Sequence, residues 1–407
     1  MRGRRAVEIE VLRRARLPAI ALLAAACATT TGDYAESPLG LYQCSEPAVA
    51  LATVPPRPPP GAAAPGKKPP KPKPIEQHAK AKKKGQKKET EPPKQFVTTQ
   101  LCGSGKLPMG KPAEATVAKG NPLLGAVDRT QESFFGGSSD EAASIVSALQ
   151  SPDTVYPRVA PASAPKPPPD PAGCLGAAYY GACFYYAAAL DLRKSDGGGA
   201  TLAIERPAFD GTGGAGHSLD EIAVQGGPKG GDIVELGWNV STSQYGDADP
   251  HLFVFHWKGW NPTCYDGCGW QQVSSYYFPG MNLGSLVGRS VYAGWLHYQG
   301  NWWAWFDGQW IGYFPDSEWN GEYVESTLVQ WFGEVASANG VPPHTDMGSG
   351  QYPADPKAAA NTSLCEVDGA RWACWIHDSL RLRSTYRPYY EIDRAAPGQT
   401  RYGGPGE

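Results

Sequence analysis

After Cys174 the chain alternates between apolar and polar residues in short runs that Gly, Asp and Asn turns divide. Because successive side chains of a strand point to opposite faces, this period of two predicts β-strands. The expected strands are Ala177–Leu192, Ser218–Gly226, Ile233–Val240, His251–Trp257, Gly269–Ser274, Ser290–Tyr298, Asn301–Phe306, Gln309–Phe314, Ser326–Ala336 and Arg371–Ile376. The pair Asp307-Gly308 predicts a tight hairpin between two of them. So many short strands without helices between them indicate an all-β fold, an antiparallel, jelly-roll-like β-sandwich.

Two of these strands carry a glutamate on the side opposite their apolar residues. In Ile233–Val240 the valine, leucine and tryptophan side chains fall on one face, and Glu235 falls on the other face with Asn239. In Ser326–Ala336 the same sorting separates the valines from Glu334. Both carboxyl groups are therefore expected on the polar side of a strand whose other side is apolar.

If these two strands neighbour each other in a curved sheet, the carboxyl groups of Glu235 and Glu334 meet across a groove. Two close carboxylates do not both ionise easily, so the pKa of one rises and that of the other falls. Such a pair can supply a general base that activates water and a general acid that protonates a leaving amine. Solvated glutamates on strand surfaces are far commoner, however, so periodicity alone assigns no function.

The first 27 residues resemble an export signal. Six arginines lie within the first sixteen residues, and an apolar run follows from Leu17 to Ala26. A basic start, an apolar stretch of about ten residues and small residues at its end are typical of a secretory signal. Cys27 follows three alanines, which fits a lipidated lipoprotein cysteine and ordinary cleavage equally well. The protein is thus expected to be secreted or held in the cell envelope, with a lipid anchor to the membrane as one alternative.

Composition separates the rest of the N-terminal part from the strands. The chain has 49 Gly and 39 Pro among 407 residues, and 19% of its residues are charged. These values exclude a coiled coil, a collagen-like chain and a polytopic membrane protein. The insert 54–94 and the linker 152–171 are rich in Pro and cannot bury enough apolar surface to fold. We expect residues 28–173 to be largely disordered, residues 174–390 to form the β-domain, and residues 391–407 to be a flexible tail.

Positive charge is concentrated in the insert. Between Lys67 and Lys94 eleven Lys stand against three Glu, although the net charge of the whole chain is −3. A block of like charges is usually a solvated, self-repelling segment. Because no aromatic residue lies among these lysines, no nucleic-acid partner is expected.

The nine cysteines fit an oxidising compartment, since an even set of eight remains once Cys27 is set aside. Spacing suggests neighbours as disulfide partners, although it does not prove connectivity. The expected pairs are Cys174 with Cys183, Cys264 with Cys268, Cys365 with Cys374 and, by elimination, Cys44 with Cys102. A zinc site at Cys264 and Cys268 would need a second pair of ligands that the sequence lacks. His251 and His256 face opposite sides of one strand and cannot share an ion, so no metal or other cofactor is expected.

A series of short motifs resembles the catalytic domain of the neprosin family of glutamic peptidases. The matching stretches, in family order, are Ser218–Val224, Val234–Val240, Tyr245–Asp247 with His251–Phe253, Cys264–Cys268, Gly300–Trp303, Ile311–Pro315, Trp331–Val335 and His344–Gly350. The resemblance extends from Gly176 to Tyr352 and, less clearly, as far as Tyr390. Eight motifs in order are much more specific than any one of them. The resemblance implies a monomeric β-sandwich endopeptidase that acts on peptides or proteins, cleaves after proline at acidic pH and follows an N-terminal pro-segment.

The same resemblance implies a role for each glutamate. Glu235 matches the family glutamate that precedes Gly-Trp, and Glu334 matches the glutamate that follows two glycines in the second motif. Which of them is the base stays open. Phe332 replaces the first of those glycines and puts a ring on the Glu334 face, and Thr345–Met347 is shorter than in the family. Both departures bear on the shape of the pocket and so on the proline preference.

Two other functions fit parts of the sequence. Trp-rich β-sandwiches also bind carbohydrate by stacking, and Trp302, Trp303 and Trp305 could form such a platform. A lipid-anchored surface protein whose basic segment touches anionic cell-envelope polymers is compatible with either activity. Retention of both glutamates favours the peptidase.

Overall fold

The computed structural model describes residues 42–45, 54–55, 102, 107–110, 172–179, 181–210, 216–228, 230–337, 343–369, 373–375 and 380–407. These residues form antiparallel sheets with almost no helix, which confirms the predicted fold class. The export signal, Cys27, most of the insert 54–94 and the linker 152–171 lie outside the described residues. No helix in the described part of the chain combines the length and the apolarity needed to cross a bilayer.

One sheet has eight strands and carries both candidate glutamates. In spatial order its strands are β17 (Arg381–Ser384), β4 (Ala182–Asp191), β14 (Ser326–Ser337), β6 (His217–Gly226), β7 (Asp232–Val240), β8 (His251–Lys258) and β9 (Asn261–Pro262), and β3 (Ala177–Tyr179) pairs with β4.

A second sheet has nine strands. In spatial order they are β10 (Gln271–Gln272), β13 (Gln309–Pro315), β12 (Asn301–Phe306), β11 (Ser290–His297), β5 (Gly197–Ala203), β15 (Ala359–Asp368), β19 (Gln399–Gly403) and β18 (Glu391–Ala396), and β16 (Ala373–Trp375) pairs with β15. The remaining elements are the β1 (Tyr42–Ser45) and β2 (Leu107–Gly110) pair, helix α2 (Thr242–Tyr245), and the 3-10 turns η3 (Gly284–Leu286) and η4 (Asp316–Trp319).

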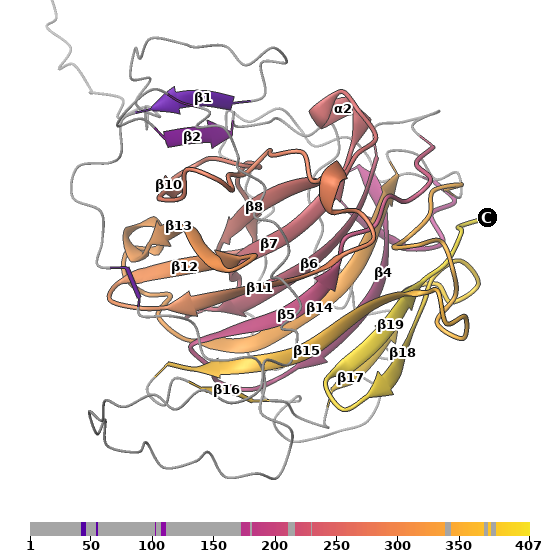
Figure 1. Cartoon of the computed structure of the whole chain (residues 1–407). Coiled ribbons are helices and arrows are strands. Elements are labelled where there is room, and N and C mark those ends of the chain that lie inside the picture. Colours follow the sequence, from indigo (N-terminus) through magenta and orange to yellow (C-terminus); the bar gives the residue numbers. More distant parts are fainter. Residues whose placement is uncertain are drawn as a thin grey trace, which may run out of the picture. The chain divides into compact units, whose positions relative to one another are not determined.

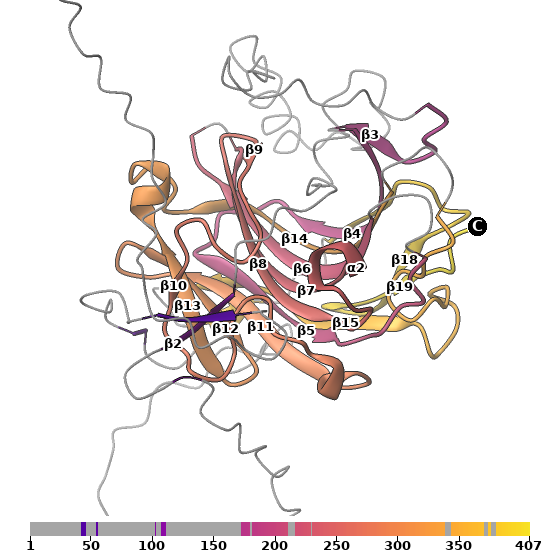
Figure 2. The same ribbon diagram turned by 90° about the horizontal axis from the view of Figure 1, so that it is seen from above.

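The two sheets pack face to face and bury one continuous apolar core between them. In Figure 1 the nine-stranded sheet lies in front of the eight-stranded one, and Figure 2 shows the two layers from above. Large side chains from both sheets fill this core, among them Tyr185, Trp238 and Trp331 from the eight-stranded sheet and Leu202, Trp295, Trp302 and Phe314 from the nine-stranded sheet.

The outer face of the eight-stranded sheet is buried as well, which the sequence did not predict. Instead of a solvated polar side, it presents a second apolar cluster with Phe184, Tyr186, Phe253, Phe255 and Phe332. Polar and acidic side chains on this face are therefore surrounded by rings rather than by water. A third, smaller cluster around Trp303 and Trp310 covers the outer face of the nine-stranded sheet.

Most of the predicted strands are confirmed. The strands β6, β7, β8 and β11 to β14 begin and end within two residues of the expected bounds. The turn at Asp307 and Gly308 joins β12 to β13 with positive φ at both residues, as the sequence indicated. The expected strand Ala177–Leu192 is instead the hairpin β3–β4, and Gly269–Ser274 shortens to β10.

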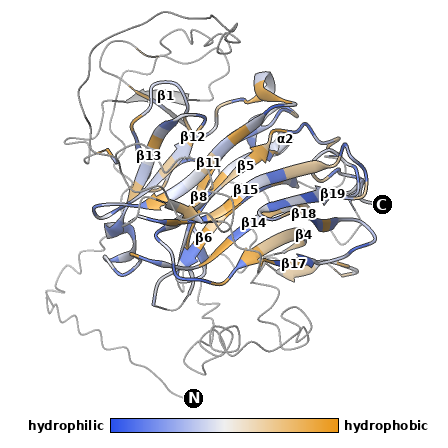
Figure 3. Cartoon of the chain, turned by 60° about the horizontal axis from the view of Figure 1, so that its bottom comes forward, coloured by the Kyte–Doolittle hydropathy of each residue, from blue (hydrophilic) through white to orange (hydrophobic). Residues whose placement is uncertain are grey.

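Several strands were missed because their sequences lack the alternating pattern. β5 begins with three glycines, and a Cβ at Gly198 would lie 2.4 Å from Cγ1 of Val329, so the glycine lets β5 approach β14. The segment 391–407, expected to be a flexible tail, instead forms β18 and β19, which pair with each other, while β19 pairs with β15. These two strands are largely hydrophilic in Figure 3, and for this reason their sequence predicted a flexible tail.

Three of the four expected disulfides are present, namely Cys174–Cys183, Cys264–Cys268 and Cys365–Cys374. Cys102 is also disulfide-bonded, and its pairing with Cys44 stays a prediction. Short loops closed in this way restrict the unfolded chain most weakly, so their main contribution is local. The bridge at Cys264–Cys268 fixes the loop that follows β9.

Candidate active site

Glu235 lies on β7 and points to the outer face of the eight-stranded sheet. Its neighbours Val234 and Leu236 both belong to the core between the sheets, so the pleat turns Glu235 outward. It sits directly between Ala223 of β6 and Phe255 of β8 in the register. Its side chain is fully buried.

Glu334 lies on β14 and points to the same outer face. Trp331 and Val335 of this strand belong to the core, which places Glu334 on the other side, as expected. In the register Glu334 sits between Tyr186 of β4 and Leu219 of β6. It too is fully buried.

The strands of the two glutamates are not neighbours, because β6 lies between β7 and β14. In the register Glu235 of β7 pairs with Ala223 of β6, and Ala223 pairs with Gln330 of β14. Glu334 is four residues beyond Gln330 on β14. In a flat sheet, two strand spacings of about 4.8 Å and four residues of about 3.3 Å put their Cα atoms roughly 16 Å apart. The two strands are therefore not adjacent, which was the condition for a close pair of carboxyl groups, although both glutamates lie on the same face of the sheet.

A third glutamate occupies the strand between them. Glu221 of β6 pairs with Gly237 and Phe332 in the register, so it lies on the same face and is a diagonal neighbour of both Glu235 and Glu334. Such diagonal pairs have Cα atoms about 7–8 Å apart. Glu221 is also fully buried. The structure therefore places three carboxyl groups in a diagonal row across β7, β6 and β14.

The sequence contained a signal for Glu221. Asp220 and Glu221 are consecutive acids on a strand, so the period of two predicts that one faces the core and the other faces outward. Asp220 faces the core, where its Oδ1 accepts a 2.7 Å hydrogen bond from Nδ2 of Asn361. Burial raises the pKa of Asp220 to about 8.

Each of the two motif glutamates meets a hydrogen-bond partner from a neighbouring strand. The indole Nε1 of Trp257 on β8 donates to Oε1 of Glu235 over 2.9 Å. The imidazole Nε2 of His217, at the start of β6, contacts Oε1 of Glu334. Trp257 and His217 are both buried. Sequence reasoning missed both partners, because each contact depends on the register between strands.

Tyr265, within the loop closed by Cys264–Cys268, packs over the same face. Its ring meets the rings of Phe253 and Phe255 edge-on, with centroids 5.7 and 5.0 Å apart. Burial raises the pKa of Tyr265 well above its usual range, and the charges of Glu334, Tyr245, Glu221 and Glu235 raise it further. All three glutamates on the face are therefore close enough to act electrostatically on this one phenol.

Phe332 narrows the site on the β14 side, as the sequence indicated. Its ring meets that of Tyr186 edge-on, with centroids 5.8 Å apart, and the phenylalanine lies directly across the ladder from Glu221. Gly333 faces the other side, where a Cβ would lie 2.7 Å from the ring of Tyr402. The site is thus a strip of acids between aromatic rings.

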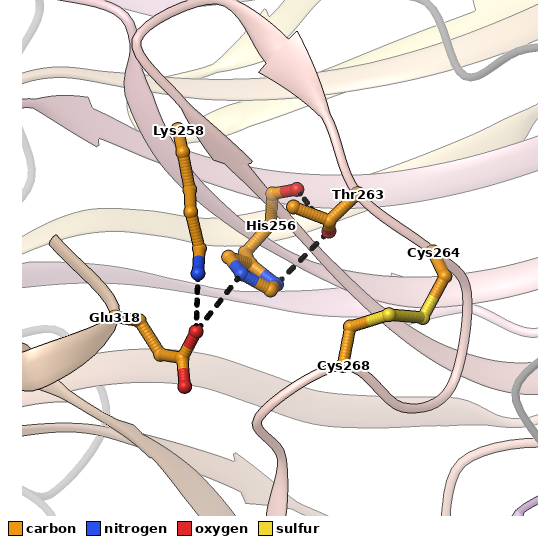
Figure 4. The surroundings of a disulfide bond; sticks show 6 residues. All are labelled: His256, Lys258, Thr263, Cys264, Cys268 and Glu318. Carbon is orange, nitrogen blue, oxygen red and sulfur yellow. Dashed lines mark hydrogen bonds and ion pairs between the residues drawn. A yellow bond between two sulfur atoms is a disulfide. The ribbon is translucent and has the colours of Figure 1, made fainter. Parts of the chain in front are cut away.

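The histidines on β8 do not belong to this site. His251 faces outward near α2, where its Nε2 contacts Oδ1 of Asp247 at 2.9 Å. His256 faces the core. Its pKa is lowered to about 3, mainly by burial and to a lesser extent by the charge of Lys258. Figure 4 shows His256 between Thr263 and Glu318, beside the Cys264–Cys268 disulfide.

No group of three or more His, Cys, Asp or Glu side chains within the described residues is arranged to hold a metal ion. The acids at Asp247 and Asp249 are engaged by protein donors instead. Nδ2 of Asn282 donates to both of them, and Arg206 forms a 2.6 Å ion pair with Asp249.

The tryptophan platform suggested for carbohydrate does not exist as such. Trp302 points into the core, where its indole donates to the Tyr323 carbonyl at 2.8 Å, and Trp303 points to the opposite face. Both are fully buried, and only Trp305 is partly exposed. Side chains on opposite faces of a strand cannot stack on one sugar.

The comparisons with known proteins cover the β-domain. The Neprosin family model matches residues 215–405, which include β6 to β19 and both motif glutamates. Among solved structures, scytalido-glutamic peptidase with a transition state analog inhibitor matches with 10% identity and a TM-score of 0.34, over 54% of this chain and 97% of that one.

Two further solved structures show the range of the likeness. SCP-B, an eqolisin-family peptidase in complex with the tripeptide Ala-Ile-His, matches with 10% identity and a TM-score of 0.32, over 54% of this chain and 97% of that one. Chicken galectin 2 matches with 13% identity and a TM-score of 0.22, over 38% of this chain and 99% of that one. Likenesses at this level assign no residue and no activity.

Proposed function

Residues 215–405 belong to the Neprosin family of glutamic peptidases, and from this premise we propose that the protein hydrolyses peptide bonds with Glu235 and Glu334. The observation that carries the proposal is that both motif glutamates lie buried on one face of one sheet, each with its own hydrogen-bond partner. Buried carboxyl groups held by fixed partners are typical of catalytic acids and bases.

We assign the base role to Glu334 and the acid role to Glu235. The partner of Glu334 is His217, which can carry a positive charge and so favours the ionised carboxylate. The cross-strand neighbours of Glu235 are Ala223 and Phe255, and this apolar burial favours the neutral acid, against the smaller opposite effect of the Trp257 indole donor. Peptide hydrolysis with water requires an ionised base and a protonated acid that act on the same bound peptide.

Activity at acidic pH is the second part of the proposal. Burial raises the pKa of Asp220, Asp266 and Glu366 to about 8 in each case. Acid lowers the stability of a fold with several such carboxyl groups less than that of an ordinary protein. The reason is that these groups are already neutral in the folded state at neutral pH. Cleavage after proline fits the aromatic rings of the site, since apolar rings are common partners of proline.

The full-length chain is proposed to be a latent form. Glu235, Glu221 and Glu334 have no exposed surface, so a peptide can reach them only after part of the chain moves or is removed. The N-terminal region also contacts the β-domain, because the indole of Trp310 donates to the carbonyl of Pro55 at 3.2 Å. If the enzyme cleaves after proline, its own linker segment Pro161–Pro171 is a substrate, and Glu235→Gln should leave the chain unprocessed in acid. Normal processing of that variant would point to an external protease.

We also propose export to an oxidising compartment, which the three disulfides within the β-domain support.

The test of the peptidase activity is digestion of a denatured protein mixture with the acid-treated protein, followed by sequencing of the new termini. We expect new termini after proline, in amounts that a chelator does not reduce. A mixture left intact under these conditions contradicts the peptidase, and cleavage without a residue preference contradicts only the proline specificity.

A further inference from the structure

Among the described residues, Tyr265 carries a buried hydroxyl without a hydrogen-bond partner on the face of the sheet that holds the three glutamates. The residue is 1% exposed, and its hydroxyl meets no hydrogen-bond partner within the part of the chain that the structure describes. Some buried tyrosines are paired, since the hydroxyl of Tyr323 donates to the Val224 carbonyl at 2.6 Å and that of Tyr390 to the Thr345 carbonyl at 2.7 Å. Within the same described ranges Tyr185 and Tyr402 share the lack of a partner, but they lie in the core between the sheets. Burying an unpaired hydroxyl costs stability, so its presence needs an explanation.

The position of Tyr265 supplies one. Its ring rests on Phe253 and Phe255, which are the cross-strand partners of Gly237 and Glu235 in the ladder. The charges of Glu334, Glu221 and Glu235 all act on its phenol. The unpaired hydroxyl thus belongs to the same face of the sheet as the row of acids, beside the strand that neighbours Glu235.

The loop holds this hydroxyl in a fixed place. Cys264 and Cys268 are bridged on either side of it, and the amide of Asp266 donates to the Val254 carbonyl at 3.0 Å. Oδ2 of Asp266 in turn accepts a hydrogen bond from the Tyr245 hydroxyl at 3.2 Å. A donor held in advance stabilises developing charge without reorganisation during the reaction.

We propose that Tyr265 is a third catalytic residue of this site, whose hydroxyl donates a hydrogen bond to the oxyanion formed when water adds to the scissile carbonyl. This inference rests on the proposed peptidase function. In the free protein the hydroxyl is unpaired because its acceptor arrives with the substrate.

The reaction then proceeds with all atoms accounted for. Glu334 takes a proton from water while the water oxygen bonds to the carbonyl carbon, and the carbonyl π electrons move to oxygen. The oxyanion accepts the hydrogen bond of Tyr265. When the carbonyl re-forms, the C–N bond breaks and the nitrogen takes the proton of Glu235. One proton then passes from Glu334 to Glu235 through solvent and restores the starting state.

Tyr265 keeps its own proton throughout. Burial and the neighbouring negative charges raise its pKa well above the usual range, so ionisation is unfavourable. The residue is a hydrogen-bond donor only, and it takes no part in the acid–base roles of the two glutamates.

The test compares Tyr265→Phe with the wild-type full chain after acid treatment, on a quenched fluorescent peptide with a single proline. Loss of one oxyanion donor lowers kcat by about 10²–10³-fold, with KM little changed. Affinity for a peptide inhibitor with a tetrahedral hydroxyl at the scissile position should fall by a similar factor. Because an unpaired buried hydroxyl is removed, the melting temperature should stay or rise.

Tyr185→Phe is the matched control, since it removes a buried hydroxyl from the opposite face of the same sheet. Its kcat should equal that of the wild type. Unchanged kcat in Tyr265→Phe, a change in KM alone, or a clear fall in its melting temperature would overturn the role of Tyr265 and leave the peptidase intact. A wild-type chain without peptide turnover would remove the proposed function itself, and the Tyr265 role with it.

Discussion

At the scale of single residues, Glu235 and Glu334 differ in the partner that each one meets. An indole donates to Glu235 and an imidazole contacts Glu334. Both kinds of N–H donor favour the ionised carboxylate, but a partner that can carry a positive charge favours it more strongly than a neutral indole does. Two chemically identical side chains on one face can therefore take different parts in one reaction.

Trp257→Phe tests the partner of Glu235. The change removes a 2.9 Å hydrogen bond to a buried carboxyl group, which costs about 1–3 kcal/mol. We expect kcat at acidic pH to fall by about tenfold or more, measured on the same fluorescent peptide. Trp302→Phe is the control, because it removes a buried indole hydrogen bond in the core far from the acids. Equal loss of kcat in the two variants would show a general effect of lost packing.

The period of two was sufficient to predict the face of each motif glutamate, but not what surrounds it. Whether Glu221, His217 or Trp257 lies near a motif glutamate depends on which strands pair and in which register. A single strand sequence does not contain that information, since register is set by long-range packing. For the same reason the sequence left open whether the strands of the two glutamates are adjacent, and β6 lies between them.

At the scale of elements, the strands whose apolar and polar residues alternate could be predicted from the sequence. The strands without this alternation could not. β7 and β14 each place their valines in the core and a glutamate outward. β5 relies on glycines that allow close approach of the sheets, and β18 and β19 are hydrophilic strands at one end of the nine-stranded sheet, with β18 at its edge. Backbone pairing rather than a side-chain pattern defines these strands.

The disulfide loop after β9 gives a prediction at this scale. Opening Cys264–Cys268 with two serines frees the loop that carries Tyr265, and closing so short a loop contributes only about 2 kcal/mol to stability. We expect a large loss of kcat with a small loss of melting temperature. In the control, serines at Cys365 and Cys374 on the nine-stranded sheet should lower the melting temperature similarly and leave kcat unchanged.

At the scale of the whole molecule, buried acids set how stability depends on pH. The pKa of Asp220, Asp266 and Glu366 is raised to about 8 in the fold, against about 4 in the unfolded chain. Below about pH 4 these groups are neutral in both states. As pH rises from about 4 to 8 they ionise only in the unfolded chain, so they destabilise the fold progressively over this window.

The melting temperature should therefore be higher at pH 4 than at pH 8, by several degrees. Measurement in the Glu334→Gln background avoids self-digestion. Asp220→Asn should reduce the difference, because the amide stays neutral at every pH and its carbonyl can still accept from Asn361. A melting temperature that rises from pH 4 to pH 8 would contradict the raised pKa values of these buried acids.

The claim on which the account depends is that Glu235 and Glu334 together hydrolyse a peptide. The most direct measurement is turnover of a single peptide at acidic pH by the acid-treated wild type, Glu235→Gln and Glu334→Gln. We predict turnover by the wild type and a loss of at least about 10³-fold in either variant, with unchanged melting curves. Turnover by a correctly folded glutamine variant at the wild-type rate would contradict the account.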